Sequence, residues 1–204
     1  MDKLFKIIPW SFLIVSSYLL ASEQEKPLFT VEELGKLSAG EVVFTEPDEP
    51  YLFEAAIQID ASASAVWDLM LNHDRVPEYV KGLKELNVLE SGENWKVIEH
   101  RFMLHPLLPK FYYVFREQYG PGFSIAFDRV KGSFKQMNGW WKIFPTENEK
   151  QVILAYSTYV EVGFFIPKSW INRGIRKRVP SLLTTFRDVV LSDLEKAERE
   201  EANR

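Results

Sequence analysis

The sequence predicts an α+β fold in which a curved antiparallel sheet of about six to seven strands surrounds one long C-terminal helix. Between residues 51 and 162, seven segments have alternating or aromatic-rich apolar side chains, which is typical of strands. Most of their connections are short and rich in Gly, Pro or polar residues, as in hairpins. After Pro167 the apolar residues recur every three or four positions, which indicates a helix. Such a sheet can bury one face only against that helix.

The elements that precede and form the sheet follow one another in a simple order. Thr30 can cap a short helix over 31–37, and Glu33 stands three positions later, which is the spacing of a capping box. The first strand begins after Tyr51 and ends at Asp60, and a serine beyond it can cap the next helix. Two short helices are expected at 65–71 and 78–80, and the other strands at 82–89, 95–104, 111–119, 123–130, 134–144 and 152–162.

The closing helix contains a proline in its interior. Pro180 removes one backbone hydrogen bond and its ring clashes with the preceding turn. We therefore expect a kink or break near Arg178, which would divide the helix into two pieces.

The N-terminus has the layout of a secretory signal peptide. Lys3 and Lys6 precede an apolar run over 7–20, and charged residues follow Ala21. The run contains Pro9 and is shorter than the roughly 20 residues that span a bilayer. We predict an exported protein, periplasmic or secreted; the alternative is an uncleaved leader that anchors the chain to a membrane. The chain then divides into a signal peptide at 1–21, a lead-in segment with its short helix at 22–50, a folded domain at 51–195 and a polar tail at 196–204.

Composition and motifs exclude several classes of function. The net charge of −4 opposes the binding of nucleic acid. The absence of cysteine excludes disulfides, thiolate metal sites and a cysteine nucleophile. The three histidines lack the HExxH spacing of a zinc site, and there is no Gly-rich nucleotide fingerprint and no GxSxG motif. We predict no metal, no cofactor and no nucleic-acid partner.

Two polar side chains on apolar strand faces are weak candidates for chemistry. Glu117 lies between Phe115 and Tyr119, where an unpaired carboxylate is costly to bury, so we expect Arg101 or Arg116 to pair with it. The alternative is that Glu117 points to solvent. His100 shares a face with apolar residues and can act as a general base or hydrogen-bond donor; the alternative is a hydrogen-bonded core histidine. Neither residue by itself defines a catalytic site.

A basic cluster lies at the start of the closing helix. Arg173, Arg176 and Lys177 follow Trp170 within two turns, a layout that suits contact with an anionic membrane surface. The alternative is a solvated helix face that later glutamates balance.

Several short motifs of the sequence resemble those of the START-like superfamily, in particular its polyketide cyclase/dehydrase and coenzyme-Q-binding branch. They are Ala61-Ser62-Ala63-Ser64-Ala65-Val66-Trp67-Asp68, Val76-Pro77-Glu78-Tyr79-Val80, Gly132-Ser133-Phe134, Gly139-Trp140-Trp141 and Pro167. The resemblance spans about residues 51–195 and implies a helix-grip fold. The superfamily includes lipid carriers, ring cyclases, hydrolases and plant hormone-binding proteins, so the resemblance alone does not identify an activity.

The more apolar faces of the strands meet the closing helix, where they line either a solid core or a ligand cavity. The resemblance favours a cavity. The residues expected to line it are Phe102, Tyr113, Phe115, Glu117, Phe127, Met137, Trp141, Tyr156, Leu182 and Phe186. We favour a carrier of a lipid, isoprenoid or aromatic compound. The alternatives are a cyclase or hydrolase that uses His100, Glu117 or Tyr156, and an interaction module with a filled core.

Overall fold

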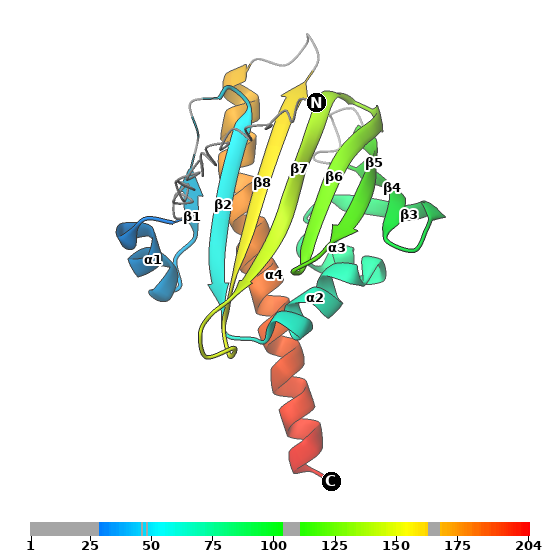
Figure 1. Ribbon diagram of the computed structural model, residues 1–204. Coiled ribbons are helices and arrows are strands. Elements are labelled where there is room, and N and C mark those ends of the chain that lie inside the picture. Colours follow the sequence, from blue (N-terminus) through cyan, green and yellow to red (C-terminus); the bar gives the residue numbers. More distant parts are fainter. Residues whose placement is uncertain (1–28, 46, 48, 104–110, 163–167) are drawn as a thin grey trace, which may run out of the picture.

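The computed structural model describes residues 29–45, 47, 49–103, 111–162 and 168–204, without the side chains of 162 and 168–171 (Figure 1). The expected leader, Pro167 and the side chain of Trp170 therefore lie outside the described part. The strands are β1 (Val43–Thr45), β2 (Leu52–Ile59), β3 (Leu83–Ser91), β4 (Trp95–Phe102), β5 (Phe111–Gly120), β6 (Ser124–Gly132), β7 (Phe134–Pro145) and β8 (Val152–Val162). The helices are α1 (Val31–Ser38), α2 (Ala63–Leu71), a short 3₁₀ helix (His73–Arg75), α3 (Val76–Tyr79) and α4 (Lys168–Ala202).

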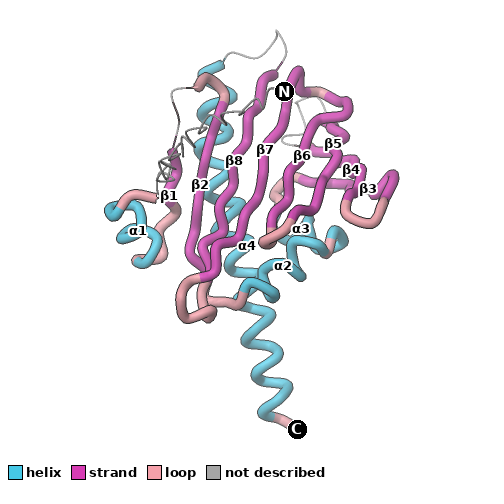
Figure 2. Tube along the Cα trace, in the orientation of Figure 1, coloured by secondary structure: helices cyan, strands magenta, loops and turns pink. Residues whose placement is uncertain are grey.

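The strands form a single antiparallel sheet in the order β1-β2-β8-β7-β6-β5-β4-β3. Strands β3 to β8 are a meander, and β2 joins it beside β8. Helix α4 crosses one face of the sheet, and its last turns extend beyond the sheet (Figures 1 and 2). Helices α2 and α3 contact α4 near the same face. The predicted α+β fold, with its curved antiparallel sheet around a long C-terminal helix, is confirmed.

The sheet has one strand more than expected. The additional strand, β1, lies in the lead-in segment and pairs with β2. Three residues are too few to show an alternating pattern, which is why the sequence did not reveal it. Thr30 and Glu33 make the expected capping box, so α1 begins at Val31. Its buried Leu37 packs with Val43 and neighbouring strand residues, and α1 thereby joins the lead-in to the sheet.

The expectation that the closing helix consists of two pieces is wrong, because α4 is one helix from Lys168 to Ala202 with Pro180 inside it. The proline removes only one of its many backbone hydrogen bonds. Val179, Leu183 and Phe186 are buried on both sides of that point, so apolar packing holds the helix together across it.

Gly139 lets the middle of the sheet pack closely. A Cβ atom at this position would lie 2.1 Å from the backbone oxygen of Ser157 and 2.6 Å from Cζ of Phe127. Both distances are far below van der Waals contact, so only glycine fits there. The ring of Phe127 takes the space that a side chain would occupy, and this ring lines a cavity between the sheet and α4.

Candidate functional site

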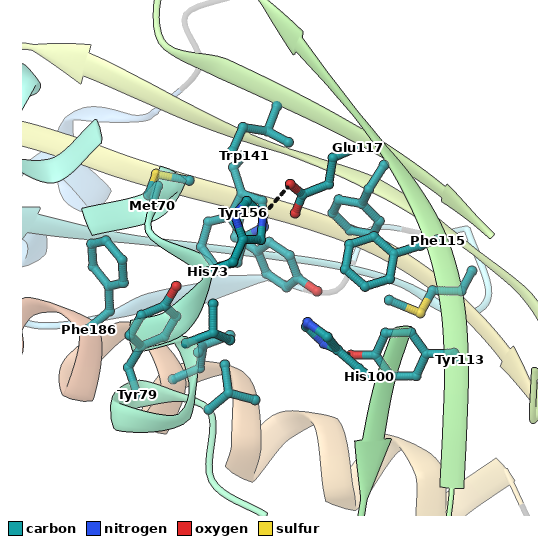
Figure 3. A pocket seen from close by; sticks show the side chains of 16 residues that line it. Met70, His73, Tyr79, His100, Tyr113, Phe115, Glu117, Trp141, Tyr156 and Phe186 are labelled. Carbon is teal, nitrogen blue, oxygen red and sulfur yellow. Dashed lines mark hydrogen bonds and ion pairs between the residues drawn. The ribbon is translucent and has the colours of Figure 1, made fainter. Parts of the chain in front are cut away.

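A cavity of about 130 Å³ lies between the inner face of the sheet and α4. That is roughly ten times the space that one water molecule requires. Figure 3 shows its labelled side chains turned toward a common space. The lining residues are Met70, His73, Val76, Tyr79, Val80, His100, Tyr113, Phe115, Glu117, Ile125, Phe127, Met137, Trp141, Tyr156, Leu182 and Phe186. Most are apolar or aromatic, as in sites for hydrophobic small molecules.

Aromatic rings shape the walls of this cavity. Trp141 and Tyr156, on the paired strands β7 and β8, have ring centroids 4.1 Å apart. On the opposite side, Tyr79 of α3 meets Phe186 of α4 edge to face at 4.9 Å. Such pairs add to the hydrophobic stabilisation of their neighbours and hold the rings in fixed orientations. Period two along the strands places the rings on the inner face.

Glu117 of β5 is held by two side chains. Its Oε2 accepts a hydrogen bond from Tyr119 Oη at 2.9 Å and lies 3.0 Å from Nε2 of His73 (Figure 3). The Glu117 side chain is 15% exposed and that of His73 is 6% exposed, so both are largely removed from water. The prediction that an arginine pairs with Glu117 is wrong, and so is the alternative that its carboxylate points to solvent.

The two arginines have other partners. Arg101 lies on the opposite face of the sheet and donates to Glu99 at 2.9 Å. Arg116 stacks over the ring of Trp95 at 4.1 Å. Arg116 directly precedes Glu117 in β5, so alternation turns its side chain to the other face, whereas Arg101 pairs with Tyr112, five positions from Glu117 along β5.

Both ring nitrogens of His73 have hydrogen-bond partners. Nδ1 is 2.9 Å from the backbone oxygen of Leu71 and 3.1 Å from Nζ of Lys96. An ammonium group can only donate, so Nδ1 either accepts from Lys96 or donates to Leu71. In the first arrangement the neutral ring carries its hydrogen on Nε2 and donates it to Oε2 of Glu117.

His100 forms a second polar point of the cavity. The residue is buried, its Nδ1 lies 3.3 Å from Tyr113 Oη, and its Nε2 is buried without a hydrogen-bond partner in the described part of the chain. Burial, followed by repulsion from His73, lowers the pKa of His100 from 6.5 to about 3. The ring is thus neutral at physiological pH, and its free nitrogen can hydrogen-bond a ligand.

The tyrosines of the site stay protonated. Burial raises the pKa of Tyr156 to about 12. It also raises the pKa of Tyr79 and Tyr113 well above the ordinary value, and the charge of Glu117 adds to this effect. Their hydroxyl groups are consequently hydrogen-bond donors rather than proton acceptors at neutral pH.

The structure places nine of the ten residues expected to line a cavity around this one. Phe102 instead lines an adjoining hollow of about 370 Å³, here called the basic hollow, at the surface between α3, the end of β4 and α4. The basic hollow is lined by Tyr79, Val80, Lys81, Phe102, Lys177, Arg178, Val179, Ser181 and Leu182. Arg173, Arg176 and Lys177 are exposed on α4, and their contact with a membrane stays a prediction.

Sequence reasoning missed His73 and Tyr79 as members of the site. His73 and Glu117 are 44 residues apart in the sequence, and no local sequence pattern predicts that they pair. Tyr79 stands in the short helix α3, where an apolar position gives no sign of a cavity.

Within the described residues, none of the helices is both long enough and apolar enough to cross a membrane. The same part of the chain holds no group of His, Asp and Glu side chains suited to a metal ion.

A curved sheet that encloses a cavity with its C-terminal helix is the START-like helix-grip fold. The chain belongs to the family described as polyketide cyclase / dehydrase and lipid transport, whose model matches residues 59–187. No curated protein matches the sequence. The expected membership of the polyketide cyclase/dehydrase family is thus confirmed, whereas the coenzyme-Q-binding part of the expectation stays a prediction.

Solved structures support the fold. Human STARD10 is 11% identical with a TM-score of 0.62, and the match covers 80% of this chain and 74% of that one. A START superfamily protein from Mycobacterium smegmatis is 13% identical with a TM-score of 0.60, covering 69% and 97%. The Zhui aromatase/cyclase from Streptomyces sp. R1128 is 14% identical with a TM-score of 0.56, covering 76% and 95%. Likeness at these identities concerns the fold alone.

Proposed function

We propose that this protein binds a hydrophobic small molecule, either a lipid, an isoprenoid or an aromatic compound, in the cavity and acts as its carrier. The cavity between the sheet and α4 carries the proposal, because apolar and aromatic side chains line it and only a few polar groups point into it. Burial of an apolar ligand there contributes about 25 cal/mol per Å² of surface removed from water. The family description includes lipid transport, which agrees with this function.

The polar groups of the cavity suit recognition better than catalysis. A general base works best when its pKa lies near the working pH, and the pKa of His100 is about 3. Glu117 is already engaged by His73 and Tyr119. These groups orient a ligand that carries a hydroxyl or carbonyl function. The third alternative, an interaction module, requires a filled core, and the cavity argues against it.

An enzyme of the cyclase type is the second candidate, and the Glu117–His73 pair favours it. A carboxylate hydrogen-bonded to an imidazole at a cavity wall can exchange a proton with a bound ring compound. The Zhui protein, of similar fold, is named an aromatase/cyclase.

The two functions are separated by returning the natural ligand to the protein. Compounds that co-purify with the protein are extracted, added back to ligand-free protein, and analysed by mass spectrometry after incubation. A carrier returns the compound unchanged, and Glu117→Ala or His100→Ala only weakens its binding. An enzyme converts the compound, and at least one of the two substitutions abolishes the conversion. Turnover by the unaltered protein would overturn the carrier proposal.

We also propose that the protein is exported. Lys3, Lys6 and the apolar run over 7–20 support this proposal. The mass of the mature protein from its own cells tests it. Loss of about the first 21 residues is the expected result, whereas a full-length chain in the membrane fraction would favour an uncleaved anchor.

A further inference from the structure

The basic hollow adjoins the cavity. Tyr79, Val80 and Leu182 line both spaces, so the two lie on either side of the same three side chains. Lys81, Lys177 and Arg178 of the hollow are exposed, whereas most residues that line the cavity alone are buried. An elongated molecule with its body in the cavity would reach the surface through the hollow.

Three cations line the basic hollow. Lys81 donates from Nζ to Oγ of Ser181 at 3.2 Å, and Arg178 donates to the backbone oxygen of Lys81 at 3.3 Å. These two contacts join the connection between α3 and β3 to α4 and bring both cations to one wall. Lys177 lies beside them on the helix. Phe102 supplies an apolar surface on the strand side.

Among the described residues these cations have no acidic partners. Among the hollow's lining residues none is acidic, and within the described part of the chain none of the three cations makes an ion pair. Elsewhere at the same helix contact the arrangement is different: Arg75 pairs with Glu78 at 2.7 Å and with Asp193 of α4. The hollow is thus a locally positive site on a chain whose net charge is −4.

We infer that the basic hollow binds an anionic head group, a phosphate or a carboxylate, of an amphipathic ligand whose apolar body occupies the cavity. This inference rests on the proposed function, since it requires a ligand in the cavity. Charge-assisted hydrogen bonds from lysine and arginine suit both head groups. The head stays partly in water at the surface, so its binding carries little desolvation cost, while the body leaves water entirely.

The test uses three probes of equal chain length: decyl phosphate, decanoate and decanol. Their affinities for the full-length protein, freed of bound compounds, are measured by calorimetry below their aggregation limits. Lys177→Gln removes a cation that makes no hydrogen bond or ion pair in the described part of the chain. Arg173→Gln is the matched control, because Arg173 is exposed on the same helix but does not line the hollow.

We expect both anionic probes to bind more tightly than decanol. Lys177→Gln should weaken the binding of the two anionic probes by about 1.5-fold to fivefold, which is the range for a solvent-exposed ion pair. It should leave decanol unchanged, and Arg173→Gln should change none of the three. The preference for anions should also diminish at high salt.

Three outcomes overturn the inference in distinguishable ways. If decanol binds as tightly as the anionic probes, the hollow does not discriminate between charged and neutral head groups, although the proposed function stands. If none of the probes binds, the inference fails, whereas the proposed function fails only if the protein purified from its own cells also carries no compound. If Lys177→Gln leaves decyl phosphate unaffected but reduces binding to vesicles of anionic phospholipid, the cations contact a membrane surface rather than the head of a bound ligand.

Discussion

Glu117 and His73 stabilise each other because each is costly to bury alone. Without His73, the carboxylate would keep, among its partners in the described part of the chain, the hydrogen bond from Tyr119 alone. We predict that His73→Ala lowers the free energy of unfolding by about 2–3 kcal/mol, because it leaves a buried charge poorly paired. Urea unfolding at neutral pH measures this change.

A second substitution checks the cause. Adding Glu117→Gln to His73→Ala should restore part of the loss, since a neutral amide costs less to bury than a carboxylate. If the double variant is no more stable than His73→Ala alone, an unpaired charge is not the reason for the loss.

His100 predicts a dependence of stability on pH. Its pKa is about 3 in the folded protein and 6.5 for an ordinary histidine. Between these values the unfolded chain takes up a proton that the folded protein does not, so stability falls as the pH falls from 6.5 toward 3. The slope from this residue is at most about 1.4 kcal/mol per pH unit. Above 6.5 its contribution is fully present.

Replacing the ring isolates this effect. The variant His100→Phe has no imidazole to protonate at this site. As the pH falls, its free energy of unfolding should therefore decrease less than that of the unaltered protein. Urea unfolding at several values between pH 7.5 and 4.5 provides the comparison. Parallel curves for the two proteins would show that His100 is not held neutral by burial.

Most of the residues that line the cavity could be predicted from the alternation of side chains along the strands. Their hydrogen-bond partners could not. Period two assigns Tyr113, Phe115 and Glu117 to one face, and the structure places all three at the cavity. The partner of Glu117 lies on another element, brought near by the fold rather than by spacing. An arginine on an adjacent strand looked suitable in sequence, but strand alternation turns it to the opposite face.

At the scale of elements, the missing side chain of Gly139 allows β7 and β8 to pair closely beside the ring of Phe127. We predict that Gly139→Ala lowers the free energy of unfolding by about 3 kcal/mol or more, because a Cβ atom 2.1 Å from the oxygen of Ser157 forces the two strands apart. Thermal and urea unfolding measure the loss.

Gly35 provides the matched control. It lies in α1 with open space around its missing Cβ, and its alanine variant should be more stable by about 0.5–1 kcal/mol. If Gly139→Ala were as stable as the unaltered protein, the close approach of the strands would not be a constraint.

Long periodic segments were predicted well, because seven strands and a 35-residue helix repeat their pattern many times. β1 was not predicted, because Val43–Thr45 is too short to show a period. Pairing with β2 holds this segment in the sheet. The continuity of α4 through Pro180 also depends on packing, which local rules do not include.

At the scale of the whole molecule, the fold encloses a space that neither layer fills. Leu182 of α4 lines both the cavity and the basic hollow, so a larger side chain there should block the path between them. Val130 of β6 is 51% exposed and lines neither space, which makes it the position for a control substitution.

Native mass spectrometry of the protein purified from its own cells, with extraction of bound compounds, is the most direct test of ligand binding in this cavity. We predict an apolar compound bound to the unaltered protein, retained in Val130→Trp and lost in Leu182→Trp, with thermal unfolding confirming that both variants are folded. A stable unaltered protein that carries no compound, or a compound retained fully in Leu182→Trp, would contradict ligand binding between the sheet and α4.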